Sequence, residues 1–121
     1  MKSVVLDANA LLMPFQRGLN IDTELARILG SYELIIPRPI IGELERNKSK
    51  EAKMGLALAR TKHIEASEKE GDMSVLDVAE RFEGIILTND RDLIEIARGR
   101  NIPVIRLVGG NRLGFDSNKE Y

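Results

Sequence analysis

Four acidic residues in separate segments are the strongest candidates for chemistry in this chain of 121 residues. Two of them, Asp7 and Asp90, follow short apolar runs with the pattern of β-strands. Glu43 lies among apolar neighbours, and Asp72 comes just before an apolar helical segment. In a parallel α/β fold, strand ends and the starts of the following helices share one side of the sheet. We therefore expect these four carboxylates to converge on one rim, where they suit a hard divalent cation with oxygen ligands.

Composition narrows the chemistry further. The chain has no Cys and a single His, which excludes disulfides, thiolate metal sites and cysteine nucleophiles. A metal centre or a catalytic triad built on histidine is also disfavoured, and His63 is expected to be a solvated or helix-end residue. The G-x-G-x-x-G pattern of dinucleotide sites and the G-x-x-x-x-G-K-[ST] pattern of P-loops are both absent.

A structural alternative stays open for three of the acids. Asp is a favoured helix N-cap, and strand-to-helix turns commonly use it in that role. Asp7, Asp72 and Asp90 each stand just before a predicted helix or turn, so each could serve as a cap. Glu43 carries more weight because its neighbours predict a place at the edge of a buried helix face, whereas Glu45 is expected to face water.

Short apolar runs alternate with helical segments along the chain. The runs at 4–6, 32–36, 85–87 and 103–107 predict strands, and residues 7–9 between the first run and the next helix have a turn-like sequence. A helix is predicted from Ser49 toward Ile64. This alternation favours an α/β fold: one three-layer α/β/α domain with a central parallel sheet of four to five strands. The domain is expected over residues 1–108, with a loosely held tail over 109–121.

Four segments carry a family resemblance, in the order and with the spacing of that family. They are residues 4–9 (VVLDAN), 36–45 (IPRPIIGELE), Asp72 with the apolar residues after it, and 86–93 (ILTNDRDL) leading to 102–104 (IPV). Together they resemble a PIN domain, a small nuclease module. The resemblance covers about nine-tenths of the chain, from Ser3 to Leu107, and implies a PIN-like α/β/α fold.

The resemblance also implies a function. It implies a ribonuclease, a hydrolase that cleaves RNA phosphodiester bonds with Mg²⁺ or Mn²⁺ and metal-activated water. Carried over by position, the catalytic and metal-ligating acids are Asp7, Glu43, Asp72 and Asp90. Asp92 is a further metal ligand, and Asn9 and Thr88 orient the carboxylates.

The subgroup is predicted from one motif. The TNDRDL stretch is closest to PIN endonucleases of ribosomal-RNA processing, and a VapC-type toxin of a toxin–antitoxin pair is the alternative. An alternative of another class is a non-catalytic RNA-binding or assembly factor. Expected partners are an RNA substrate, a second copy of the chain in a homodimer, and an antitoxin or ribosome-assembly factor.

The net charge of the chain is compatible with RNA binding when the four candidate metal ligands are left out of the count. The formal net charge is −1, and it becomes +3 without the four candidate ligands. The candidate RNA contacts are basic residues beside the proposed site: Arg38, Arg46, Lys48, Lys50, Lys53 and Arg91. A solvated helix face is the alternative interpretation of the basic stretch. No apolar run is long enough for a signal peptide or a membrane span, so we expect a cytoplasmic protein without membrane contact.

Overall fold

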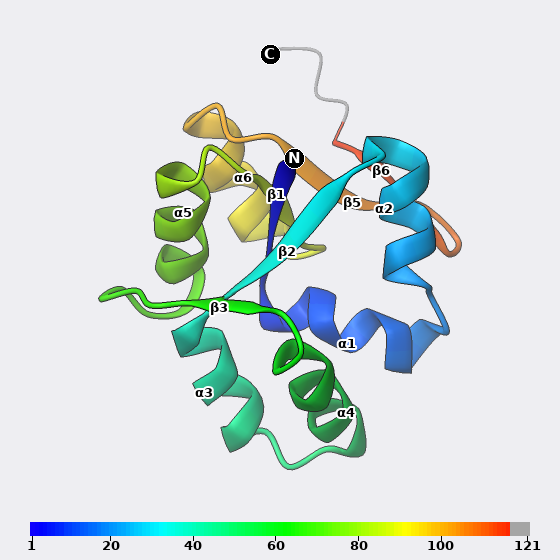
Figure 1. Cartoon of the computed structure of the whole chain (residues 1–121), viewed down its shortest axis with the longest axis vertical. Coiled ribbons are helices and arrows are strands. Elements are labelled where there is room, and N and C mark those ends of the chain that lie inside the picture. Colours follow the sequence, from blue (N-terminus) through cyan, green and yellow to red (C-terminus); the bar gives the residue numbers. More distant parts are fainter. Residues whose placement is uncertain (117–121) are drawn as a thin grey trace.

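A six-stranded sheet lies at the centre of the computed structural model, which describes residues 1–116 (Figure 1). The strand order is β3-β2-β1-β4-β5-β6. The first five strands in sequence are parallel, and β6 pairs with β5 in the antiparallel direction. The strands are β1 (Lys2–Leu6), β2 (Tyr32–Pro37), β3 (His63–Glu65), β4 (Ile85–Leu87), β5 (Val104–Gly109) and β6 (Arg112–Phe115).

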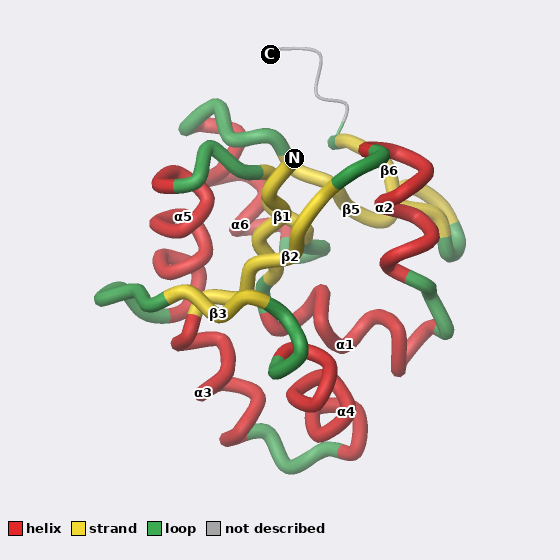
Figure 2. Tube along the Cα trace, viewed as in Figure 1, coloured by secondary structure: helices red, strands yellow, loops and turns green. Residues whose placement is uncertain are grey.

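Helices cover both faces of this sheet (Figure 2). The α5 and α6 helices lie on one side of it, and α1 and α2 lie on the other (Figure 1). The α4 helix packs against α1 and α3. The helices are α1 (Ala8–Arg17), α2 (Ile21–Leu29), α3 (Arg38–Arg46), α4 (Lys50–Ala59), α5 (Gly71–Arg81) and α6 (Arg91–Gly99). The predicted α/β fold is confirmed, with a mixed six-stranded sheet in the described residues where four to five parallel strands were expected.

Two elements occupy segments for which other structures were predicted. Residues 8 and 9, predicted as part of a turn, begin α1, a helix that also contains Pro14. Its buried Ala10, Leu11 and Met13 pack into the core, which offsets the backbone hydrogen bond that proline cannot donate. The helix predicted from Ser49 toward Ile64 ends at Ala59, and residues 63–65 form the short edge strand β3.

The prediction of a loosely held tail is wrong for its first part. Residues 112–115 form β6, and Leu113 is buried. The Leu113 N–H donates to Glu24 Oε1 at 2.9 Å, and its carbonyl accepts from Arg27 Nη2 at 2.8 Å. Contacts with α2, which is distant in sequence, thus hold this strand on the sheet. The rest of the predicted tail, residues 117–121, lies outside the described residues.

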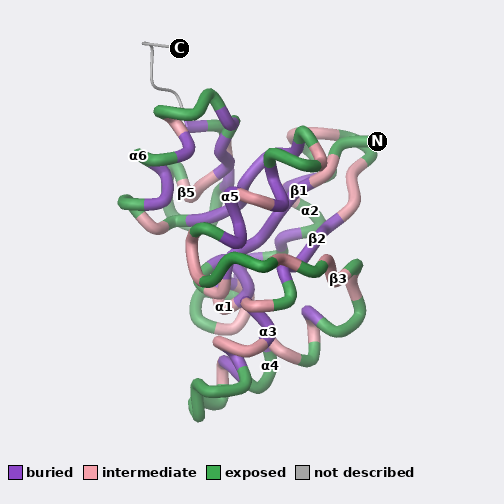
Figure 3. The backbone as a smooth tube through the Cα atoms, turned by 90° about the vertical axis from the view of Figure 1, so that its left-hand side faces the viewer, coloured by how far each residue is buried: buried purple, intermediate pink, exposed green. Residues whose placement is uncertain are grey.

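The core is densest where β1 lies between β2 and β4 (Figure 3). Val4, Val5 and Leu6 are fully buried, as are the central residues of the neighbouring strands. Because the chain passes from β1 to β2 on one side and β4 stands on the other, the strand order reverses at β1. In open α/β sheets ligands bind outside the carboxyl ends of the strands at such a switch point. None of the helices in residues 1–116 has the length and apolar character needed to cross a bilayer.

Candidate active site

Asp7 stands at the switch point, directly after β1. The register pairs Leu6 with Leu87 of β4, so Asp7 and Thr88 follow at the same level and point to the same side. Asp7 is buried, with 5% of its surface exposed. Its Oδ1 accepts a hydrogen bond from the Ala10 N–H at 2.8 Å, and its Oδ2 accepts one from the Thr88 hydroxyl. A carboxylate has about four lone-pair positions, so capping α1 leaves Asp7 with acceptor capacity for a cation.

Asp90 is held at the end of the neighbouring strand by the same threonine. Its N–H donates to Thr88 Oγ1 at 3.0 Å. Its Oδ1 caps α6 by accepting from the N–H groups of Asp92 and Leu93 at 2.9 and 3.3 Å. The capping interpretation therefore holds for Asp7 and Asp90, and in both it occupies only part of the carboxylate. Thr88, which is fully buried, links the two acids.

Glu43 and Asp72 come from two helices that begin on this side of the sheet. Glu43 is half-buried on α3, and Glu45 is exposed. Asp72 is half-buried in the first turn of α5, whose N-cap is Glu70, so Asp72 is not the cap. A side chain on Gly71 would place its Cβ 3.9 Å from Glu43 Oε1, and the backbone φ of +52° there favours glycine. The turn before Asp72 thus lies close to the Glu43 carboxylate.

The four carboxylates are linked electrostatically. Burial, opposed by the hydrogen bonds from Thr88 and Ala10, raises the pKa of Asp7 from 3.8 to about 6, and the charges of Asp72 and Asp90 add to this rise. Burial and then the Asp72 charge raise the pKa of Glu43, and burial followed by Asp90 and Asp92 raises that of Asp72. Arg46 is the cation that acts against this trend, at Glu43. Charges of one sign thus come together here.

An all-oxygen donor set of this kind fits a hard divalent cation. In residues 1–116, no three acidic or histidine side chains are already arranged as a closed metal-binding group. The fit rests instead on the donor chemistry: buried or half-buried carboxylates repel one another, and within residues 1–116 no cation offsets the raised pKa of Asp7 or Asp72. A bound cation would relieve that repulsion.

The other predicted site residues are mostly exposed. Asp92 is exposed in the first turn of α6, and its charge acts on Asp72. Asn9 is also exposed, and its side chain makes no hydrogen bond with another residue in 1–116, so its role in orienting the carboxylates stays a prediction. The candidate RNA contacts are all exposed: Arg38, Arg46, Lys48, Lys50, Lys53 and Arg91.

Comparison with known proteins agrees with this geometry. A family model described as a PIN-like domain matches residues 4–110. The chain belongs to the PIN-like domain family. Two curated relatives are archaeal. Ribonuclease VapC4 of Methanocaldococcus jannaschii is 35% identical over 117 residues, which cover 87% of this chain and 89% of that protein. Ribonuclease VapC9 of Archaeoglobus fulgidus is 31% identical over 110 residues, covering 85% and 81%.

Two solved structures share the fold of this PIN-like domain. The PIN domain endonuclease Utp24 superposes with a TM-score of 0.81 over 96% of this chain and 92% of that chain, at 17% identity. A domain of a functionally unknown protein from Methanocaldococcus jannaschii gives a TM-score of 0.60 over 90% and 93%, also at 17% identity. At this identity the likeness concerns the fold. The PIN resemblance predicted from the motifs is confirmed.

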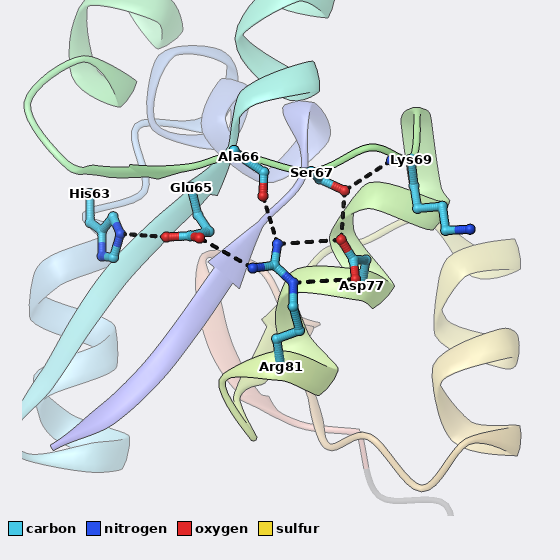
Figure 4. A network of polar contacts seen from close by, with 7 residues as sticks. All are labelled: His63, Glu65, Ala66, Ser67, Lys69, Asp77 and Arg81. Carbon is cyan, nitrogen blue, oxygen red and sulfur yellow. Dashed lines mark hydrogen bonds and ion pairs between the residues drawn. The ribbon is translucent and has the colours of Figure 1, made fainter.

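A second polar cluster of this PIN-like domain lies beside β3 (Figure 4). Arg81, at the end of α5, donates to Glu65, to Asp77 and to the Ala66 carbonyl, the last at 2.6 Å. Ser67 donates to Asp77 at 2.7 Å. His63 is exposed on β3 and contacts Glu65 through Nε2 at 2.9 Å, so of the two predicted alternatives it is the solvated residue and not the helix-end one. We call these residues the Arg81 network.

A third polar cluster was not predicted from the sequence. Arg98 on α6 and Arg106 on β5 both bond to the buried Asp116. The available signal was Arg106 itself, a single cation inside an otherwise apolar predicted strand. Asp116 could not be recognised because it follows β6, which was predicted to be tail.

Proposed function

We propose that this PIN-like domain is a ribonuclease that hydrolyses RNA phosphodiester bonds with Mg²⁺ or Mn²⁺ bound at the carboxylate rim of Asp7, Glu43, Asp72 and Asp90. One observation carries the proposal. Asp7 is buried at the switch point, and the charged groups that act on it, Asp72 and Asp90, are both negative. Active sites are places where burial and like charges shift pKa values, so a buried carboxylate perturbed in this way is a candidate functional group.

The residues of the rim have separate tasks in this proposal. Asp7 and Asp90 would hold the cation directly, and Thr88 fixes both by donating to Asp7 and accepting from Asp90. Glu43 and Asp72 would complete the ligand set, with Asp92 at its exposed side. When bound, Mg²⁺ or Mn²⁺ supplies a Lewis acid for the phosphoryl group and activates water. No side-chain base is then needed, and the one histidine, His63, contacts Glu33 and Glu65 and no rim carboxylate.

Among PIN ribonucleases, we place this chain with the VapC type. Both curated relatives above 30% identity carry that name, and they match along most of their length. The TNDRDL motif favours the ribosomal-RNA-processing type, but the similarity to Utp24 is 17% identity and concerns the fold. The proposal therefore includes a small antitoxin as partner in preference to a ribosome-assembly factor. A homodimer and a cytoplasmic location remain part of the proposal.

The direct test is cleavage of labelled RNA by the wild-type protein with Mn²⁺ or Mg²⁺, beside Asp7→Asn and the control Asp22→Asn on α2. We expect metal-dependent cleavage, with products carrying 5′-phosphate and 3′-hydroxyl ends, that Asp7→Asn abolishes and Asp22→Asn retains. Equal cleavage by Asp7→Asn would remove Asp7 from the reaction. RNA binding without cleavage at any metal concentration would favour the non-catalytic RNA-binding alternative.

A further inference from the structure

A cleft of about 440 Å³ begins beside Asp90 and extends away from the carboxylate rim. Asn89 and Arg91, the two neighbours of Asp90 in sequence, line its near end. Its walls continue along α6 to β5 and to Asp116, which follows β6. Figure 1 shows α6 beside β5 along this path. We call this space the α6–β5 cleft.

Three arginines line the α6–β5 cleft: Arg91, Arg98 and Arg106. Arg91 and Arg98 are seven residues apart on α6, so they lie on the same helix face with about 10 Å between them along the axis. Arg91 is exposed and makes no side-chain hydrogen bond with another residue in 1–116. The cationic groups therefore form a row that starts next to the proposed site of cleavage.

The far end of this row is held in place by Asp116. Arg98 Nη2 donates to Asp116 Oδ2 at 2.9 Å, and Arg106 Nε donates to Asp116 Oδ1 at 3.0 Å. Arg106 Nη1 also donates to the Leu107 carbonyl at 2.8 Å. The side chain of Asp116 is 5% exposed, whereas those of Arg98 and Arg106 are 34% and 35% exposed. A molecule in the cleft thus meets guanidinium groups, while the carboxylate that orients them is covered.

We propose that the α6–β5 cleft is the path of the RNA backbone beyond the scissile phosphate, with Arg91 and Arg106 contacting successive phosphate groups. This inference rests on the proposed function and identifies the part of the substrate that the enzyme holds. Arginine binds phosphate oxygens through its planar fork of donors, and orientation in advance lowers the entropy lost on binding. Among the described residues, the lining contains two acids, the exposed Glu95 and the buried Asp116. The three arginines outnumber these two acids, so the cleft carries a net positive charge.

The chemistry of the lining favours the backbone over the bases. Within residues 1–116, the side chains that line the cleft include no aromatic ring on which a base could stack. Contacts to phosphates position a nucleic acid without reading its sequence. The cleft would therefore set where the strand lies, and any choice of target sequence would come from elsewhere on the domain.

The test measures binding apart from cleavage. A short fluorescein-labelled single-stranded RNA is titrated with Asp7→Asn protein, which does not cleave, and its anisotropy is followed at several salt concentrations. Arg91→Ala and Arg106→Gln are introduced separately into this background. The matched control is Arg100→Ala, an exposed arginine after α6 that pairs with Glu80 and does not line the cleft.

We expect Arg91→Ala and Arg106→Gln each to weaken binding about tenfold, the loss typical of one charge-assisted hydrogen bond. Each should also reduce the salt dependence of log K by about 0.7, the value for one phosphate contact on a single strand. Arg100→Ala should change binding less than twofold, and thermal melting checks that every variant is folded. Folded Arg91→Ala and Arg106→Gln proteins that bind like Arg100→Ala would overturn the proposal. So would a loss confined to Arg91→Ala.

Failure of the cleft inference can be distinguished from failure of the proposed nuclease function. If the wild-type protein cleaves RNA while the cleft variants bind and cleave normally, the cleft inference fails and the nuclease stands. If no RNA is cleaved but the cleft variants lose binding, the nuclease proposal fails, and the cleft stands as an RNA-binding path without a scissile phosphate.

Discussion

The carboxylate rim and the Arg81 network both contain acidic residues, but their charges are organised in opposite ways. At the rim, acids face acids, and burial followed by like charge raises the pKa of Asp72 and Glu43. In the Arg81 network each acid has donors. Hydrogen bonds from His63 and Arg81 lower the pKa of Glu65, and those from Ser67 and Arg81 lower that of Asp77 despite some desolvation.

This difference separates charges that serve the fold from charges that serve a ligand. The Arg81 network connects β3, the following loop and α5 through paired donors and acceptors (Figure 4). It is complete within the protein. In the proposed function a cation completes the carboxylate rim, because a bound cation would offset the repulsion between its acids. The predictions below test this contrast, beginning with the largest expected effect.

Asp72→Asn should reduce RNA cleavage by more than about 100-fold, since even outer partners of metal ligands cost about 10–100-fold. Asp72 is the rim residue whose charge acts on both Asp7 and Glu43. Initial rates with Mn²⁺ measure the effect. Asp77→Asn, on the same helix but in the Arg81 network, is the matched control and should keep the wild-type rate per folded molecule. Equal losses in the two variants would erase the distinction between the regions.

The stability of the metal-free protein should depend on pH through Asp7. Its folded pKa is raised from 3.8 to about 6, so the folded state holds the proton more strongly, and stability falls as pH rises through this interval. The full cost above the folded pKa is about 3 kcal/mol. Asn at position 7 does not titrate, so the stability of Asp7→Asn relative to wild type should increase by about that amount from pH 4 to pH 7.

Urea unfolding at several pH values measures this difference. Asp77 supplies the opposite sign: its folded pKa is lowered, so its stabilising contribution is lost as pH falls. The deficit of Asp77→Asn relative to wild type should therefore shrink toward low pH. If the stability difference between Asp7→Asn and wild type does not vary with pH, Asp7 does not carry the burial cost assigned to it.

Thr88→Val should reduce cleavage about 10–100-fold, as expected for a residue that orients a metal ligand. The substitution removes the donor to Asp7 and the acceptor for the Asp90 N–H while keeping the shape of the side chain. Thr88→Ser retains the hydroxyl and should recover most of the rate. The Mn²⁺ concentration for half-maximal rate should rise in Thr88→Val. A variant with full activity at the wild-type Mn²⁺ concentration contradicts a positioning role for Thr88.

Arg81→Ala should lower the thermal midpoint and leave cleavage per folded molecule unchanged, the smallest effect on activity in this series. Arg81 is part of an exposed network, and such ion pairs contribute little each. Thermal melting and initial rates on the same sample separate the two effects. Loss of cleavage in a folded Arg81→Ala protein would show that the network also positions Asp72, which follows the loop that it holds.

The sequence indicated the central strands and the acids at their ends because both depend on local patterns. Fully buried parallel strands are continuous apolar runs, as in Val4-Val5-Leu6 and Ile85-Ile86-Leu87. Their order cannot be derived from such patterns, but a carboxylate directly after a run lies at the sheet edge in any parallel order. That is why Asp7 and Asp90 could be singled out in advance.

The elements that were missed depend on distant partners. β3 has three residues, of which His63 is exposed and the other two are half-buried, and it is a strand because it pairs with β2. β6 contains a glycine and follows another, and Leu113 is fixed by Glu24 and Arg27 of α2. Asp116 became visible as a partner of Arg98 and Arg106 only once β6 was in place. The strand pairing of β3 and the contacts of β6 with α2 leave no local signal in the sequence.

Calorimetric titration of Mn²⁺ into the metal-free protein at neutral pH, without RNA, tests the central claim most directly. Wild type, Asp7→Asn and Asp77→Asn are compared. The proposed site predicts that wild type and Asp77→Asn bind Mn²⁺ with similar affinity and that Asp7→Asn loses this binding. Absence of Mn²⁺ binding by wild type, or equal binding by Asp7→Asn, would contradict a metal site at the carboxylate rim.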